Sequence, residues 1–194
     1  PDCPENVDFM ADLKEWGGIC NRVYIWDYVN NYRETACIFP NFGVMQRNVQ
    51  IFHENNVKGI YEEGNYYIYL CDTEFADLRT YLIAKLLENP YCDYDAAMLD
   101  FCTYYYGAGG QYIKAAVDEI TDHTKDHVTI YSSMTESFAI DEKEAEKIDQ
   151  LWSRAENAAG SDEALEAIRR SKLSWRYLKA CLGLREFSGT TEQT

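Results

Sequence analysis

Two short runs of β-forming residues, separated by one amphipathic segment, constrain the fold of this chain more than any other feature. The first run is "RVYIWDY", at residues 22–28, and the second is "VKGIYEEG", at residues 57–64. The first is apolar at odd and even positions through Trp26, which is typical of a strand buried on both faces in a parallel sheet. An apolar stripe after Pro40 predicts a helix between the runs. The sequence therefore predicts a parallel βαβ unit.

Helical periodicity accounts for the rest of the predicted structure. Residues 5–17 have apolar side chains at helical spacing, and the glycine pair that begins at Gly17 predicts the end of that helix. A further helix follows the second strand and ends before Pro90. Beyond Pro90 the periodicity predicts four helices, at residues 94–106, 110–125, 142–158 and 162–183. We therefore divide the chain into βα units at residues 1–90 and a helical module at residues 91–194.

A sheet of only two strands is not stable by itself. Either it pairs with strands that this sequence does not contain, or the helices of the chain cover it. The doubly apolar first strand favours further strands. The predicted fold class is therefore α/β and mostly helical: the C-terminal strands and helices of a TIM-type (β/α)8 barrel, followed by a helical extension. Open sheet edges also predict self-association.

The composition excludes several classes of partner. A formal net charge of −15 argues against nucleic acid, because phosphate binding needs clustered Lys and Arg, and it disfavours anionic lipid surfaces for the same reason. The longest apolar run is far too short to span a bilayer, so no membrane insertion is predicted. The seven cysteines show no CxxC or CxxH spacing, which argues against structural zinc.

The histidines give little indication of a metal or catalytic site. His123 and His127 have i, i+4 spacing, but they lie at a predicted helix end and no third ligand is evident nearby. The sequence contains no P-loop, nucleophile elbow, HExxH or GxGxxG motif. We therefore predict no metal and no cofactor.

Carboxylates close both predicted strands. Asp27 ends the first strand, and Glu62 and Glu63 end the second, so a parallel βαβ unit puts them at the same edge of the sheet. Glycoside hydrolysis requires two carboxyl groups, about 5–5.5 Å apart for retention or roughly 6.5–9.5 Å for inversion. Aromatic neighbours would stack on sugar rings and raise the pKa of one acid by desolvation. These neighbours are Trp26, Tyr28, Tyr61, Tyr66 and Tyr67.

Two other interpretations of these acids remain open. Acids at strand ends commonly cap a turn or accept a hydrogen bond from a backbone N–H, which would make Asp27 and Glu62 structural. Alternatively they hold substrate hydroxyls, while the catalytic pair lies on strands outside this sequence.

Four ordered motifs resemble a bacterial protein family. They are "LKEWGGICNRVYIWDYVNNY", "PNFGVMQRNVQIFHENNVKGIYEEG", "DLRTYLIAKLLENPYCD" and "FCTYYYGAGGQYI". In this order they resemble the domain of unknown function 4838 family, over residues from about 5 to about 120. The resemblance implies a glycoside-hydrolase-like (β/α)8 barrel, distantly similar to α-glucuronidases and β-hexosaminidases, in large and often secreted proteins of gut and soil bacteria.

The family motifs bear on the candidate site. The family's "WDY" corresponds to residues 26–28, and its "KG-aromatic-E-x-G" falls within residues 58–64, which implies Glu62 rather than Glu63 as the second acid. The family often has Trp before the proline of the third predicted helix, where this chain has Glu88 and Asn89. That departure affects helix packing more than the site.

We therefore predict part of a glycoside hydrolase that acts on a polysaccharide or glycan. The predicted catalytic residues are Asp27 and Glu62. The predicted substrate-binding residues are Trp26, Tyr28, Tyr61, Glu63, Tyr66 and Tyr67. The alternative is a non-catalytic carbohydrate-binding or structural helical module of a larger protein. The predicted partner is a carbohydrate substrate, together with upstream barrel strands or a second copy. A secreted or cell-envelope location follows from the resemblance alone.

Overall fold

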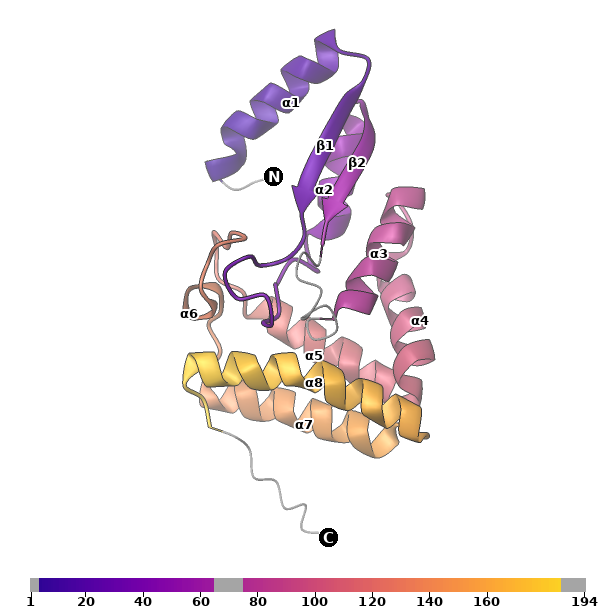
Figure 1. Ribbon diagram of the computed structural model, residues 1–194, viewed down its shortest axis with the longest axis vertical. Helices are drawn as coiled ribbons and strands as arrows, with labels where there is room; N and C mark the ends of the chain where they lie inside the picture. The colour runs from indigo at the N-terminus through magenta and orange to yellow at the C-terminus, as the bar shows by residue number, and fades with distance from the viewer. Residues whose placement is uncertain (1–3, 65–74, 186–194) are drawn as a thin grey trace.

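The computed structural model describes residues 4–64 and 75–185 (Figure 1). Within these residues the elements are η1 (Pro4–Asn6), α1 (Val7–Ile19), β1 (Val23–Tyr28), α2 (Met45–Glu54), β2 (Val57–Glu63), α3 (Ala76–Glu88), α4 (Tyr94–Tyr106), η2 (Gly107–Gly109), α5 (Gly110–Asp122), α6 (Met134–Ser137), α7 (Glu142–Ala158) and α8 (Asp162–Leu182). This order confirms the predicted mostly helical α/β class. None of the described helices has the length and apolar character needed to cross a membrane.

β1 and β2 form a two-stranded parallel sheet, and α2, which connects them, lies behind the strands in Figure 1. Leu13 of α1 packs with Ile51 and Phe52 of α2 against one face of the sheet, where Ile25 and Ile60 project. Burial alternates along β1, so Tyr24, Trp26 and Tyr28, which point away from these helices, are exposed. The expectation of a strand buried on both faces is therefore wrong for the described residues, because helices cover only one face.

α1 continues through Gly17 to Ile19, so the predicted helix end at the glycine pair is also wrong. A β-carbon at Gly17 would lie 2.7 Å from the carbonyl oxygen of Asn55, which follows α2. The glycine therefore allows α1 to approach the end of α2 closely, and it does not terminate the helix.

The helices after residue 90 pack around the main hydrophobic core. α5 lies between α4 and α7, and α8 runs alongside α7 (Figure 1). The largest fully buried side chains are Trp152 of α7 and Trp175 of α8. The same core cluster includes Ile38, Phe42 and Leu82 from the first half of the chain. The division at residue 90 stays a prediction, and the core is continuous across it.

A buried ion pair joins α7 to α8. Lys179 Nζ donates to both carboxylate oxygens of Asp149, at 2.9 and 2.8 Å, and the indole N–H of Trp175 donates to Oδ1 at 2.7 Å. Lys179 is 2% exposed and Asp149 is 5% exposed. Each charge removed from water thus has an opposite charge and a hydrogen bond, which is the condition for tolerating ions in a core.

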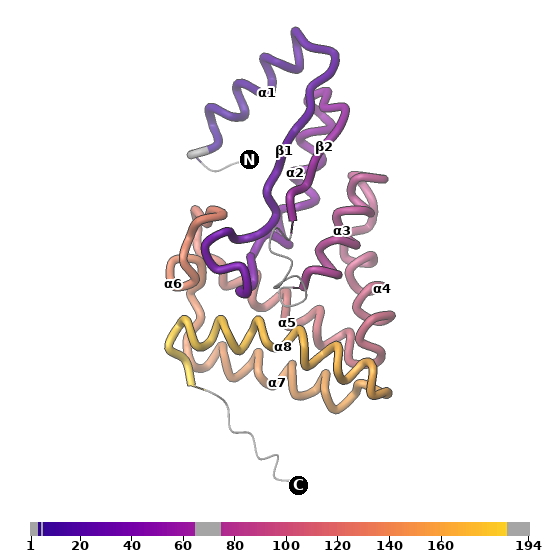
Figure 2. The backbone as a smooth tube through the Cα atoms, in the orientation of Figure 1, coloured from indigo at the N-terminus to yellow at the C-terminus, as the bar shows by residue number. Residues whose placement is uncertain are grey.

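The segment between α5 and α7 returns to the strand half of the molecule. In Figure 2 the path of residues 123–140 runs beside the loop that follows β1. Backbone hydrogen bonding supports this contact, since the N–H of Tyr32 donates to the carbonyl oxygen of Ile130 at 2.7 Å. The loop after β1 is therefore anchored by a hydrogen bond to the segment between α5 and α7.

Candidate functional site

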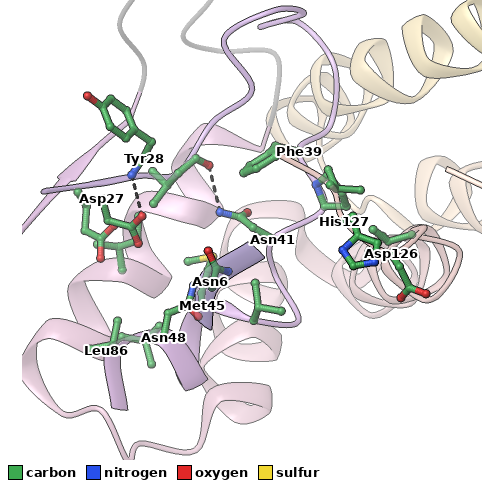
Figure 3. Close-up of a pocket in the computed structure, with 18 of the residues that line it drawn as sticks. Asn6, Asp27, Tyr28, Phe39, Asn41, Met45, Asn48, Leu86, Asp126 and His127 are labelled. Carbon is green, nitrogen blue, oxygen red and sulfur yellow. Dashed lines mark hydrogen bonds between the residues drawn. The ribbon is translucent and has the colours of Figure 1, made fainter. Parts of the chain in front are cut away.

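A cavity of about 380 Å³ lies beside the carboxyl ends of β1 and β2 (Figure 3). Its walls come from the strand ends, the loop before α2, α2 itself and residues 124–128. Asp27 and Glu62 both line it, together with the amide side chains of Asn41 and Asn48. The structure therefore brings the two predicted catalytic acids to one cavity.

Asp27 and Glu62 are direct partners across the parallel sheet, and Ile25 pairs with Ile60 two positions earlier. Side chains alternate along a strand, so this register directs both carboxylates toward the α2 side. The backbone N–H of Tyr28 donates to Oδ1 of Asp27 at 2.8 Å, which is the contact expected of a structural acid. In contrast, Oε2 of Glu62 is buried and has no hydrogen-bond partner in the described part of the chain.

The surroundings of this pair favour the protonated forms of both acids. Burial, reinforced by the charge of Asp27, raises the pKa of Glu62 to about 7. Burial also raises the pKa of Asp27, while the hydrogen bond from the Tyr28 N–H acts in the opposite direction. Near neutral pH, Glu62 is therefore placed to exchange its proton, beside an acid that has a donor to stabilise its anion.

The opposite face of the sheet carries four large aromatic side chains. We refer to Tyr24, Trp26, Tyr28 and Tyr61 as the aromatic face, and they are 69%, 63%, 41% and 57% exposed, respectively. The rings of Trp26 and Tyr61 meet edge to face with centroids 4.9 Å apart. A β-carbon at Gly59 would lie 2.6 Å from the ring of Tyr24, so glycine allows that ring to lie against β2.

Glu63 lies on the same side of the sheet as the aromatic face. Its Oε2 accepts a hydrogen bond from the indole N–H of Trp26 at 2.8 Å, and its Oε1 accepts one from the hydroxyl of Tyr32 at 3.1 Å. Burial and the neighbouring Glu63 carboxylate raise the pKa of Tyr32 well above its ordinary value, so the phenol keeps its proton and donates. The Glu63 carboxylate is thereby held in one orientation among aromatic rings.

Strand alternation divides the predicted site residues between two surfaces. Asp27 and Glu62 line the cavity, whereas the side chain of Glu63 and the rings of the aromatic face lie on the other side of the sheet; Tyr28, at the end of β1, also contributes to the cavity wall. Two predicted residues lie outside the described part of the chain, namely Tyr66 and Tyr67. The single sugar site expected from the sequence therefore becomes two neighbouring surfaces at the ends of the same strands.

A family model for a domain of unknown function, DUF4838, matches residues 2–118. The chain belongs to the DUF4838 family. The match covers more than half of the chain and includes Asp27, Glu62, Glu63 and the aromatic face, although residues 124–128 of the cavity wall lie beyond it, and it confirms the predicted family. Neither the curated proteins nor the solved structures gave a match.

Across residues 4–64 and 75–185 of this DUF4838 chain, no group of three or more His, Cys, Asp or Glu side chains is placed to hold a metal ion. His123 is instead engaged within the helical half, with Nδ1 2.7 Å from the carbonyl oxygen of Glu119 and Nε2 2.9 Å from the carboxylate of Glu144. These two contacts raise the pKa of His123. The histidine therefore links the end of α5 to the start of α7.

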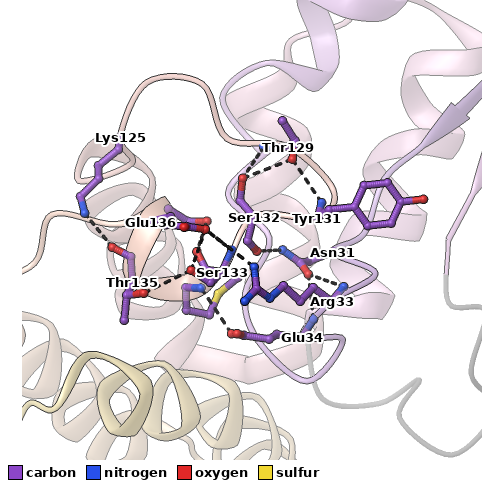
Figure 4. A network of polar contacts seen from close by, with 12 residues as sticks. Asn31, Arg33, Glu34, Lys125, Thr129, Tyr131, Ser132, Ser133, Thr135 and Glu136 are labelled. Atoms are coloured by element: carbon purple, nitrogen blue, oxygen red, sulfur yellow. Dashed lines mark hydrogen bonds and ion pairs between the residues drawn. The ribbon is translucent and has the colours of Figure 1, made fainter.

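Sequence reasoning missed Tyr32, which lies in a polar loop of the DUF4838 domain. Asn31 fixes this loop, because its side-chain oxygen accepts from the backbone N–H groups two and three positions later, both at 2.8 Å. Its side-chain amide also donates to the carbonyl oxygen of Ser132 at 2.8 Å, across 101 positions of sequence (Figure 4). The turn at Asn31 could be predicted from the sequence, because Asn often forms hydrogen bonds with the backbone that follows it. The contact with Ser132 could not be predicted in this way, because it joins residues 101 positions apart.

Arg79 of α3 fixes one wall of the cavity. It is 2% exposed, and its guanidinium donates to the side-chain oxygen of Asn41 and, at 3.4 Å, to the carbonyl oxygen of Phe39. The guanidinium also lies 4.5 Å from the ring centroid of Phe42. Asn41 in turn donates to the carbonyl oxygen of Val29 at 3.1 Å. The loop before α2 is therefore held between α3 and the end of β1.

Proposed function

We propose that this DUF4838 domain is part of a glycoside hydrolase that cleaves O-glycosyl bonds, with Asp27 and Glu62 as its acid–base pair. The observation that carries the proposal is the pair itself. Two carboxylates that are direct partners on parallel strands share one cavity, and the pKa of Glu62 is raised to about 7. A purely structural acid would have donors for its buried oxygen, whereas Glu62 Oε2 has none in the described residues.

The two acids divide the reaction between them. Glu62, with a pKa of about 7, holds a proton in a large share of molecules at neutral pH and donates it to the glycosidic oxygen as the bond to the anomeric carbon breaks. Asp27, stabilised as an anion by the Tyr28 N–H, acts as nucleophile or as base toward water. The released sugar keeps the proton of Glu62. If Asp27 is the nucleophile, water then breaks the bond between Asp27 and the anomeric carbon, supplying the new hydroxyl group there and the proton that returns to Glu62. If Asp27 is the base, it takes this proton from water, and the proton returns to Glu62 through solvent.

We also propose that β1 and β2 are adjacent strands of a (β/α)8 barrel and that the later helices are an extension of it. The strands are parallel, α2 connects them, and helices cover one face only among the described residues. Helices form the outer ring of such a barrel. The aromatic face would then lie on the inner side of the strands, with Tyr28 and Glu63 at the open mouth, where substrate is bound. A secreted or envelope location, beside extracellular glycans, belongs to the same proposal.

The barrel arrangement makes Glu63 the competing candidate for the catalytic acid, and mutagenesis separates the two. The assay is release of reducing ends from a panel of polysaccharides by the full-length protein. We expect Asp27→Asn and Glu62→Gln each to lower turnover by about 100-fold or more, which is the usual contribution of acid–base catalysis. The matched control is Glu88→Gln, which removes an exposed carboxylate of α3.

Unchanged turnover in both Asp27→Asn and Glu62→Gln refutes their catalytic role. Loss of turnover only in Glu63→Gln would identify Glu63, beside the aromatic face, as the catalytic acid. Loss in the Glu88→Gln control would show that the assay reports folding rather than chemistry.

The second candidate function is a non-catalytic carbohydrate-binding module. The four exposed rings of the aromatic face favour it, because aromatic side chains present flat apolar surfaces that suit the C–H faces of sugars. Saturable binding of a glycan by the wild-type protein, without release of reducing ends from that glycan, would identify this function.

A further inference from the structure

We infer that the aromatic face binds chains of uncharged sugars and that Glu63 excludes acidic ones. This inference rests on the proposed carbohydrate function and adds the class of substrate to it. It concerns the surface opposite the cavity of Asp27 and Glu62, so binding and hydrolysis can be tested separately.

The first support is the size and openness of the aromatic face. Its four rings are 41–69% exposed, although they lie side by side on a sheet rather than singly on a surface. Contiguous exposed apolar groups of this kind mark interaction sites. From Tyr24 to Tyr28 the strand extends roughly 13 Å, at about 3.3 Å per residue, and Tyr61 widens the surface on β2. That length suits a short oligosaccharide better than a single ring.

The second support is the carboxylate at the end of this row of rings. Glu63 is fixed by Trp26 and Tyr32, and each of its oxygens accepts one hydrogen bond from them. A flat apolar protein surface placed on the rings would bury this negative charge without a compensating cation, which is unfavourable. A sugar suits both the rings and the carboxylate, because its C–H faces contact the rings while its hydroxyl groups donate hydrogen bonds to Glu63.

The same carboxylate discriminates by charge. Among the described residues, no Lys or Arg forms an ion pair with Glu63. A uronic acid carboxylate or a sulfate bound on the rings would therefore meet a like charge with no compensating cation. The formal net charge of −15 adds repulsion at longer range. Neutral glycans avoid both costs.

The test is a binding comparison with the full chain, by isothermal titration calorimetry and by tryptophan fluorescence. The neutral probes are cellotetraose, mannotetraose and chitotetraose. Tetragalacturonate and its fully methyl-esterified form are a pair that differ in charge and by one methyl group per sugar. We expect at least one neutral probe to bind, and the ester to bind at least about tenfold more tightly than the free acid, which corresponds to about 1.4 kcal/mol.

Four variants assign this binding to the surface. Trp26→Ala and Tyr61→Ala should each weaken neutral-probe binding about tenfold or more, and circular dichroism should show a retained fold because both side chains are exposed. Glu63→Gln should strongly reduce the preference for the ester, while the net charge of the chain leaves a smaller residual preference. Tyr104→Ala removes a tyrosine that is 90% exposed on α4 and should leave binding unchanged.

Several outcomes would overturn the inference. These are failure of every neutral probe to bind, binding that survives both ring deletions, and equal affinity for the ester and the free acid. Self-association that Trp26→Ala abolishes, in the absence of glycan binding, would make a second copy the occupant. Ring-dependent binding without any hydrolysis contradicts only the proposed catalysis, whereas hydrolysis without ring-dependent binding contradicts only this inference.

Discussion

Glu62 should make the protein less stable as the pH rises. Burial, reinforced by the charge of Asp27, raises the pKa of Glu62 from 4.5 to about 7. Between these values the folded protein retains a proton that the unfolded chain has released. The free energy of unfolding therefore falls from about pH 4.5 to about pH 7, and the loss is complete above the folded-state pKa.

The size of this effect follows from the pKa shift. A shift from 4.5 to about 7 corresponds to an upper limit of about 3.4 kcal/mol, at about 1.36 kcal/mol per unit. Glu62 is only partly buried, and solvent screening reduces this figure to about 2 kcal/mol. Glu62→Gln keeps the shape of the side chain and removes the charge. We therefore expect the variant to be about 2 kcal/mol more stable than wild type at pH 8, and nearly equal to it at pH 4.5.

Urea unfolding followed by tryptophan fluorescence, at intervals between pH 4.5 and pH 8, measures this difference. The pKa of His123 is also raised, so its contribution is lost over part of the same range, but the subtraction of variant from wild type cancels it. Glu88→Gln should give a curve parallel to that of wild type. A wild-type-minus-Gln difference that stays constant with pH would refute the assignment of a perturbed carboxyl to Glu62.

Three further changes test other parts of the structure. Asp149→Asn should cost about 3–5 kcal/mol of stability in urea unfolding, because it removes the carboxylate to which the buried Lys179 ammonium donates two hydrogen bonds, and adding Lys179→Met should recover much of the loss; no recovery would refute this reasoning. Gly59→Ala should displace the exposed Tyr24 ring and change the near-ultraviolet circular dichroism, with a stability change of only about 0.5 kcal/mol because the ring can move into solvent; an unchanged spectrum would contradict the ring's position. His123 contributes stability below its ordinary pKa of about 6.5 that is lost as pH rises through its raised folded-state pKa, so His123→Gln should flatten the curve between pH 6 and 8 by less than about 1 kcal/mol, and an unaltered slope would contradict it.

The order of helices and strands could be predicted because it depends on local patterns. α8, for example, begins after Ser161, whose side chain accepts a hydrogen bond from the N–H of Ala164, and its apolar stripe continues to Leu182. The start of α6 is also marked by a local sequence signal. Ser133 and Glu136 form a reciprocal capping box at its start, and this spacing is visible in the sequence.

The number of covered sheet faces could not be predicted from β1 alone. Tyr24 and Trp26 favour a strand whether or not a second layer covers them, since β propensity reflects a pleated and half-buried surface. The separation of Asp27 from the rings beside it was predictable, because consecutive residues of a strand point to opposite faces. The pKa of Glu62, in contrast, depends on how the cavity packs around it.

The orientation of Glu63 is the least local feature of the candidate site. It depends on Tyr32, whose loop is held by hydrogen bonds to residues 130 and 132 on the other side of the fold. No periodicity or motif connects segments about 100 positions apart. Propensity predicts the strands, and only the tertiary arrangement determines which acid the rings surround.

The anchoring of the Tyr32 loop has a practical consequence for how this family is handled. The family match ends at residue 118, inside α5, and residues 130 and 132 lie beyond that limit. A recombinant protein cut at residue 118 would end within a helix and would lack the chain that supports the loop. The segment recognised by sequence comparison is thus shorter than the unit that holds the surface in shape, and a binding experiment on that segment alone would test a carboxylate without its support.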